Sequence, residues 1–468
     1  MLQKLFLIFL SSTVLFSCTA PSFYEKSYDF NKNIATGHFD EAEKMLEDNK
    51  DKLEDSKIRF LYFVNGGLVE HLKGNFELSN EFFEKADLFV EDERKNGLEQ
   101  GAAFLLNPNI STYYGEDHEI LMINYYKALN YYMMNDHDDA LVEVRRLNLR
   151  LQSLSEKYSD SAKYKEDAFM HALMGMIYES NNDHNNAFIA YRNAYKIYES
   201  DYQEMFEMGA PLQLKKDLIR SAYRAGMNEE RRFYEKKFNE SYDPKTEGNT
   251  SVLLLWNNGM GPVKEEWGIN FAIVYTGGGW VNFVSKEYGL SFPFYVGDTD
   301  LYGLTWIKVV FPRYVTRNML FDRAEVKIGE NTYPLELAED LDAISFKVLN
   351  ERMLAEFAKS LLRVALKQVA AYKVGDNNDS PALGATLSFL ASATESADTR
   401  NWQTLPHSIY YKRVPVEPGK TTMEFTLFGE KTNPEPHTLE VDVKAGQTLI
   451  YPFYSLGAYE PATLNRAK

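Results

Sequence analysis

The feature that most constrains the fold is a pattern of small and aromatic residues that recurs in the first half of the chain. Gly67 is followed by Phe83, and Gly175 is followed at the same offset by Tyr191. A small residue at a helix crossing lets two antiparallel helices approach, and the aromatic ring fills the groove between neighbouring pairs. Because one helix pair cannot bury its own apolar face, the pattern predicts stacked pairs.

Weaker copies of the pattern occur at Gly37–Ala42 and at Ala128–Ala140, and apolar residues keep helical spacing across residues 25–240. These spacings resemble tetratricopeptide repeats. The resemblance implies an all-α solenoid with a concave face for an extended peptide or a partner helix. A helical bundle with coincidental spacing is the alternative.

Near residues 239–250 the helical pattern gives way to turn-forming and charged residues. Beyond this boundary, runs of β-branched and aromatic residues alternate with Gly, Pro and Asn, which predicts strands. We expect a hairpin turn at Thr276–Gly279, since glycines supply the positive φ values of tight turns.

The predicted fold class is therefore α+β multidomain: an N-terminal all-α helical-repeat solenoid resembling tetratricopeptide repeats, then mixed β-rich domains with a long helix. The predicted division is a signal peptide (1–17), a lipidated tether (18–24), a helical-repeat domain (25–240), a β-rich domain (251–335), a helical segment packed on it (336–395) and a small C-terminal β-sandwich-like module (400–468).

The N-terminus predicts export and a lipid anchor. A cation at Lys4 precedes an apolar run that is too short to span a bilayer, and the only cysteine of the chain, Cys18, ends this segment. Leu15, Phe16 and Ser17 before it resemble a lipobox, from which Phe16 departs in size. The resemblance implies cleavage between Ser17 and Cys18 and acylation of Cys18. An ordinary secretory signal with a chance cysteine is the alternative.

The residues after Cys18 begin with Thr19 and carry no early acidic cluster. By resemblance to lipoprotein sorting signals, this favours the inner leaflet of the outer membrane, facing the periplasm. The lipid anchor then makes the membrane one partner. Acidic residues outnumber basic ones by 68 to 51, and the resulting charge of −17 would repel a phosphate backbone. We therefore expect no nucleic-acid partner.

Catalytic signatures such as H-E-x-x-H and G-x-S-x-G are absent from the sequence. We accordingly predict no enzyme, no catalytic or metal-binding residues and no cofactor. Four tryptophans, Trp256, Trp267, Trp280 and Trp402, are candidates for stacking on sugar rings, although tryptophan in strands is more often part of the core.

Several phrases of the mature chain resemble a family of bacterial repeat lipoproteins without an established biochemical function. The phrases are Tyr114–Glu116, Tyr125–Asn130, Ala140–Asn148, Asn258–Glu265, Phe311–Arg313 and Ala397–Pro406. The resemblance implies a lipid-anchored scaffold, with an association with activators of cell-wall synthases. The polar and aromatic residues of these phrases are the candidate interaction residues: Tyr125, Glu143, Arg145, Arg146, Asp398, Arg400 and Trp402.

Spacing alone predicts that Glu143 and Arg146 pair, because they lie one helical turn apart, and that Asp398 and Arg400 orient a loop beside Trp402. We predict an envelope scaffold that binds protein partners in cell-wall or envelope assembly. A glycan- or nutrient-binding lipoprotein is one alternative. A cell-wall enzyme, with a cleft of perturbed carboxylates assembled from distant residues, is the other.

Overall fold

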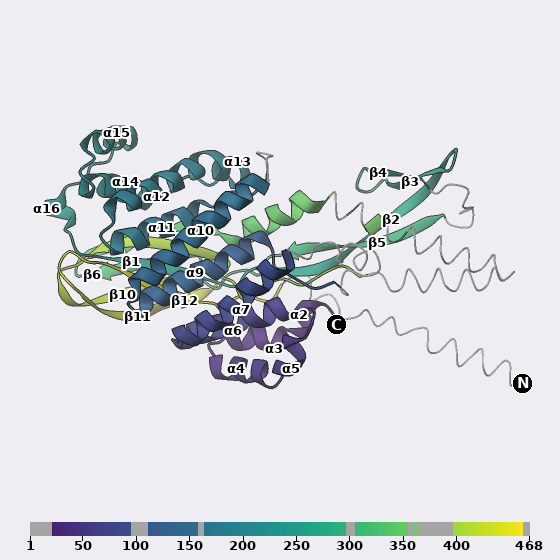
Figure 1. The fold of residues 1–468 in the computed structure, drawn as a ribbon, viewed down its shortest axis with the longest axis horizontal. Coiled ribbons are helices and arrows are strands. Elements are labelled where there is room, and N and C mark those ends of the chain that lie inside the picture. Colours follow the sequence, from purple (N-terminus) through teal and green to yellow (C-terminus); the bar gives the residue numbers. More distant parts are fainter. Residues whose placement is uncertain are drawn as a thin grey trace, which may run out of the picture.

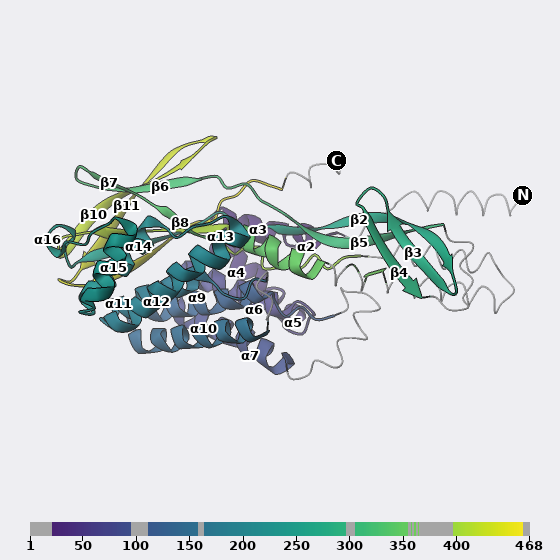
Figure 2. The ribbon, with the colours of Figure 1, turned by 90° about the horizontal axis from the view of Figure 1, so that it is seen from above.

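The computed structural model describes residues 21–94, 111–157, 163–295, 305–353 and 396–461, together with residues 357, 360, 361 and 364. Helices form one layer of the molecule and strands form the layers beneath it (Figures 1 and 2). The prediction of an α+β multidomain chain, helical first and β-rich afterwards, is confirmed.

The helical layer consists of antiparallel pairs that follow one another along the chain. The pairs are α3 (Tyr28–Ala35) with α4 (Phe39–Glu47), α6 (Arg59–Lys73) with α7 (Phe76–Arg94), α9 (Asp117–Met133) with α10 (His137–Lys157), α11 (Ala168–Ser180) with α12 (His184–Ile197), and α14 (Leu212–Arg224) with α15 (Asn228–Phe238). Shorter helices complete the layer: α2 (Phe23–Lys26), α5 (Lys50–Glu54), the π-helix η2 (Tyr198–Tyr202), α13 (Gln203–Phe206) and α16 (Pro244–Glu247).

Each pair turns at a residue with positive φ. The turn residues are Gly37, Gly74, Asn135, Asn182 and Gly226, with φ between 58° and 83°. Glycine and asparagine adopt this left-handed conformation at the lowest cost, and it ends a helix. These glycines and asparagines lie within or beside the repeat copies found in the sequence, so one turn chemistry recurs through the layer.

The predicted glycine–aromatic crossings are present. A Cβ on Gly67 would lie 2.8 Å from the ring of Phe83, and one on Gly175 would lie 2.6 Å from the ring of Tyr191. Any side chain larger than hydrogen would therefore push the paired helices apart.

Two four-stranded sheets form a sandwich beneath the helices. The sheet next to the helices has the order β12 (Thr448–Ser455), β1 (Ser251–Asn258), β9 (Ser408–Pro415), β8 (Glu336–Asp340). The outer sheet has the order β11 (Thr432–Val443), β10 (Gly419–Gly429), β6 (Arg323–Ile328), β7 (Asn331–Pro334). β1 is parallel to β12 and antiparallel to β9.

β1 is buried along its whole length because it has a layer on each face. Leu253 and Leu255 belong to the apolar core shared with the helices, whereas Val252, Leu254 and Trp256 belong to the core between the two sheets. A strand covered on both faces reads as a continuous apolar run rather than as an alternating one.

The predicted boundary between a β-rich domain at 251–335 and a separate module at 400–468 is wrong. Strands from both ranges share each sheet of the sandwich, since β1 pairs with β9 and β12, and β6 pairs with β10. Residues 336–340, predicted as the start of the helical segment, form β8 instead, because they pair with β9 at the sheet edge. The helix begins at residue 341, where the Asp340 side chain accepts a hydrogen bond from the backbone N–H of Ala343.

A third sheet projects from one end of the molecule (Figures 1 and 2). Its order is β4 (Leu290–Tyr295), β3 (Trp280–Ser285), β2 (Val263–Gly277), β5 (Trp306–Val315). The predicted hairpin joins β2 to β3, and Gly278 has φ +63°. Phe357 and Leu361, which are both helical, share an apolar core with this sheet.

We predict that Gly175→Ala lowers the free energy of unfolding by about 1–3 kcal/mol, because the new methyl group overlaps the Tyr191 ring. The measurement is urea-induced unfolding followed by circular dichroism. Gly209→Ala is the control, since its Cβ would meet nothing closer than Gln203 Oε1 at 3.5 Å. Equal stability of the two variants would show that the helix crossing tolerates a methyl group.

Candidate functional site

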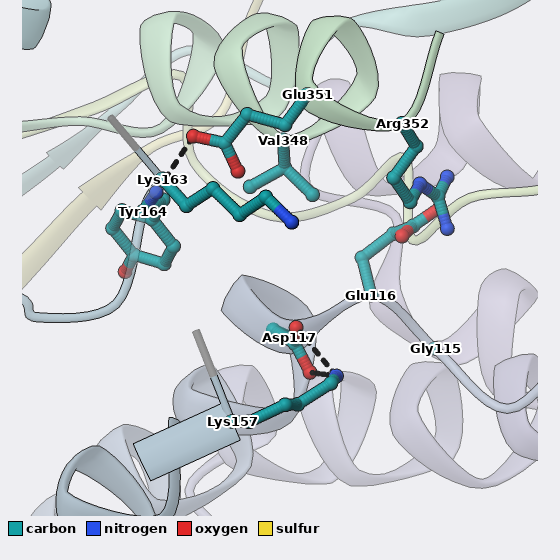
Figure 3. A pocket seen from close by; sticks show the side chains of 9 residues that line it. All are labelled: Gly115, Glu116, Asp117, Lys157, Lys163, Tyr164, Val348, Glu351 and Arg352. Atoms are coloured by element: carbon teal, nitrogen blue, oxygen red, sulfur yellow. Dashed lines mark hydrogen bonds and ion pairs between the residues drawn. The ribbon is translucent and has the colours of Figure 1, made fainter. Parts of the chain in front are cut away.

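A charged pocket of about 190 Å³ lies where the start of α9 faces residues 163–164 and the helix that begins at residue 341 (Figure 3). Acidic and basic side chains line it in equal number: Glu116, Asp117, Glu351, Lys157, Lys163 and Arg352. The side chains come from segments far apart in the sequence, so the fold alone brings them together.

Local backbone geometry places Glu116 at the pocket. Gly115 has φ +81°, and a Cβ on it would lie 2.5 Å from the ring of Phe60, so this position requires glycine. Glu116 then caps α9, and its backbone N–H donates to Glu119 Oε2 at 3.0 Å. This turn directs the Glu116 side chain toward the helix at residue 341 (Figure 3).

Glu116 is the most strongly held charge of the pocket. Its Oε1 accepts hydrogen bonds from Lys264 Nζ and from Arg352 Nη2, each at 2.8 Å. Burial alone would raise the pKa of Glu116, but the charges of Lys264 and Arg352 outweigh burial and hold the pKa well below its usual range. Glu116 therefore stays ionised and links β2 to the helix at residue 341.

Glu119, one turn further along α9, is a second buried carboxylate. Burial and the nearby charge of Glu116 raise the pKa of Glu119 to about 7. Its oxygens accept from the hydroxyl of Tyr113 and from the backbone N–H of Trp402, each at 2.7 Å. The loop that contains Trp402 is thus fixed to the same helix end.

The rim of the pocket carries weaker pairs. Lys157 Nζ lies 3.1 Å from Asp117 Oδ2, and Glu351 Oε1 accepts from the backbone N–H of Tyr164 at 2.6 Å (Figure 3). Burial raises the pKa of Glu351. With both charge signs facing one small cavity, the arrangement suits ion pairing or a small zwitterionic group. In the described part of the chain, His, Cys, Asp and Glu do not gather in groups of three or more that could hold a metal ion.

The predicted loop pairing of Asp398 and Arg400 is present. The Arg400 guanidinium donates to both Asp398 oxygens, at 2.8 and 2.7 Å, and to the backbone carbonyl oxygens of Lys57 and Ser111. Trp402 is buried beside them. These residues hold the loop against the helical layer, so the segment Ala397–Pro406 has a structural role.

The other candidate interaction residues separate into buried and exposed groups. Tyr125 is fully buried and donates through its hydroxyl to Asn257 Oδ1 at 2.9 Å. Glu143 is buried and pairs with Arg146 at 3.3 Å, which confirms the predicted pair. Arg145 is exposed on α10, so it is accessible to a partner.

The four candidate tryptophans do not form one platform. Trp256 and Trp402 are buried in the core, and Trp267 is partly buried. Only Trp280 of the four is exposed, at 47% of its surface. A sugar platform made of all four is therefore wrong, because the sandwich core encloses Trp256 and the helical core encloses Trp402.

Leu15, Phe16, Ser17 and Cys18 lie outside the described residues. Among the described residues, no helix combines the length and apolar composition needed to cross a bilayer.

Sequence reasoning missed the central pair of the pocket, Glu116 and Lys264. Both residues lie in phrases that carry the family resemblance, and that resemblance was the one sequence feature that could have singled them out. Their contact was not predictable from spacing, since 148 positions separate them. A third phrase reaches the same region, because Asn401 Nδ2 donates to the carbonyl oxygen of Pro262 at 2.8 Å.

Asp342 is a further buried carboxylate that sequence reasoning missed. It lies in the first turn of the helix at residue 341, and His407 Nε2 is 3.5 Å from its Oδ2. Burial is the main cause that raises the pKa of Asp342 to about 8. The folded chain therefore keeps a proton on Asp342 at pH values where the unfolded chain has released it.

We predict that Lys264→Met lowers the free energy of unfolding by about 3–5 kcal/mol, because a buried carboxylate loses its enclosed partner. Arg352→Met is the matched control and should cost about 1 kcal/mol or less, since its side chain is 43% exposed. Urea titration of both variants measures the difference. Equal losses would contradict the central role of Lys264.

We also predict that the contribution of Asp342 to stability falls as pH rises from about 4 to about 8, because unfolding releases the proton of Asp342. Asp342→Asn removes this contribution, so the variant should gain stability relative to the natural chain, by up to about 5 kcal/mol above pH 8. Urea unfolding at several pH values tests this. Asp322→Asn, at an exposed aspartate, is the control. A difference that does not vary with pH would refute the assignment.

The sequence matches no protein-family model and no curated protein sequence. Among solved structures, it is similar to the crystal structure of BtubC (BKLC) from P. vanneervenii. The identity is 14% and the TM-score is 0.31, over 45% of this chain and 78% of that one.

Proposed function

We propose that this chain is a lipid-anchored interaction scaffold of the bacterial envelope. Cys18 would hold it at the periplasmic side of the outer membrane, and the helical layer would bind a protein partner. The observation that carries the proposal is an exposed stripe on α10, formed by Val142, Arg145 and Leu149.

The inner face of the helical layer is not accessible to a partner. It packs on the sheet that contains β1, and side chains of the layer bond to that sheet. Tyr132 Oη accepts from the backbone N–H of Ile450 at 3.0 Å, and His71 Nε2 lies 2.6 Å from Tyr454 Oη. The concave groove expected of a helical solenoid is thus filled by the chain's own strands, and the outer face remains for binding.

The stripe on α10 has the composition of a binding surface. Val142 is 38% exposed and Leu149 is 63% exposed, and Arg145 lies between them at helical spacing. The buried centre of a protein interface is more apolar than the rest of the surface, and arginine is enriched there. The neighbouring Arg146 is already paired with Glu143 and Glu84. Arg145 therefore supplies the positive charge, and an apolar partner surface with a carboxylate would complement it.

The test is affinity purification from crosslinked membranes, with partners identified by mass spectrometry. We predict that the natural chain recovers a specific envelope protein and that Leu149→Glu with Arg145→Glu loses it at least about tenfold. Cys18→Ala should lose both membrane attachment and the partner. The matched control is Ile189→Glu, since Ile189 is 42% exposed on α12, outside the stripe.

Retention of the partner by the stripe variant would show that α10 is not the binding surface. Recovery of bound glycan without a specific protein would favour the glycan-binding alternative. A chain that stays in the soluble fraction with Cys18 intact would contradict the lipid anchor.

A further inference from the structure

Large aromatic side chains gather on the outer face of the projecting sheet. Trp280, Tyr295 and Trp306 expose 47%, 59% and 62% of their surfaces, and Val274 exposes 45%. Soluble proteins seldom leave several large aromatic residues exposed on one face unless that face contacts something. The rings of Trp280 and Tyr295 lie 5.2 Å apart, so they form a continuous surface.

Strand register places these side chains on one face. Trp306 of β5 pairs with Ala272, Val274 pairs with Asn282, and Trp280 pairs with Tyr295. Side chains opposite each other across strands point to the same side of a sheet. Val284 and Pro293 occupy the same face between the rings, since Ala272 pairs with Val284 and Asn282 with Pro293.

The other face of the sheet is already covered. Phe271 and Phe283, which alternate with the outer residues along β2 and β3, are buried against Phe357 and Leu361. The outer aromatic face is therefore not the core side of the sheet. It is a second surface, on which Asn282 and Lys308 lie among the aromatic and aliphatic side chains, and its sheet projects away from the helical layer (Figures 1 and 2).

We propose that this face lies in the interfacial region of a lipid bilayer. Tryptophan and tyrosine suit that region because their rings combine an apolar body with a polar group. The net charge of −17 opposes adsorption to anionic lipids, so ring insertion into a zwitterionic surface is the contact that this chemistry favours. The inference rests on the proposed lipid anchor for its choice of a bilayer over a soluble partner.

The position of the chain's N-terminal part supports a bilayer as the occupant. α2 packs against β2, at the base of the projecting sheet. The stretch from Cys18 to Ser22 spans at most about 14 Å when fully extended. An acylated Cys18 would therefore hold the bilayer near this base. A sheet that lay along the membrane surface from there would bring its outer face to the lipid over the length of β2, about 45–50 Å.

The experiment uses the lipidated protein in phosphatidylcholine vesicles with brominated acyl chains, which quench tryptophan fluorescence only at contact range. Emission is compared with that in unbrominated vesicles. We expect quenching in the natural chain and almost none in Trp280→Ser with Trp306→Ser. Of the three tryptophans that remain, Trp256 and Trp402 are buried, and Trp267 packs against the covered face of the sheet. Phe233→Ser is the matched control, since Phe233 is 59% exposed on α15, at the opposite end of the molecule (Figure 1).

A second measurement is independent of the anchor. The chain from Thr19 onward retains every described residue, and its sedimentation with the same vesicles gives a partition coefficient. The partition coefficient of the double variant should be at least about tenfold lower than that of the natural chain, and the Phe233 variant should match the natural chain.

Equal emission in brominated and unbrominated vesicles would overturn the proposal, even if the lipidated protein floats with the vesicles. A chain with Cys18 intact that binds the vesicles no more tightly than the Thr19 chain would count against the anchor alone. A change in Trp280 or Trp306 emission with an N-acetylglucosamine oligomer, and none with lipid, would make the face a sugar platform and also overturn the proposal.

Discussion

The enclosure of β1 between two apolar layers is the constraint on which the rest of the architecture depends. Its eight residues are all buried, so every side chain needs an apolar or hydrogen-bonded partner on one side or the other. The helical layer supplies the partners of Leu253 and Leu255, and the outer sheet supplies those of Val252 and Leu254. The helices and the outer sheet are thus two coverings of one strand, and the sheet that contains this strand closes the inner face of the helical layer.

The local parts of this fold were predictable because they rest on short-range chemistry. Gly67 and Phe83 lie in the two helices of one pair, as do Gly175 and Tyr191, and helical geometry fixes how they meet. The sheets were not predictable in the same way. Ser251 pairs with Thr448, and Asn258 pairs with Ser408, across long stretches of sequence that carry no register signal. Strand propensity identified most of these segments, but it could not assign them to a common sheet.

The candidate site divides along the same line. The pairs Glu143–Arg146 and Asp398–Arg400 were predictable because their members are three and two positions apart. The pair Glu116–Lys264 was not, although both residues lie in phrases that marked the family resemblance. Those phrases meet around the start of α9, so the resemblance singled out a structural junction. The charged residues at this junction need their particular partners because they are buried, and a buried charge without its partner is costly.

The parallel pairing of β1 with β12 has a consequence for the order in which the molecule can assemble. A chain emerging from a ribosome or an export channel presents β1 well before β12. Until Thr448–Ser455 arrives, one edge of this strand, which is buried along its whole length in the folded chain, has no hydrogen-bonding neighbour. Such an edge invites pairing with other chains. The helical pairs can form early from local contacts, but the sandwich must wait for nearly the last strand to be delivered. Late closure of this kind leaves the chain open to pairing with other chains until its last strand arrives.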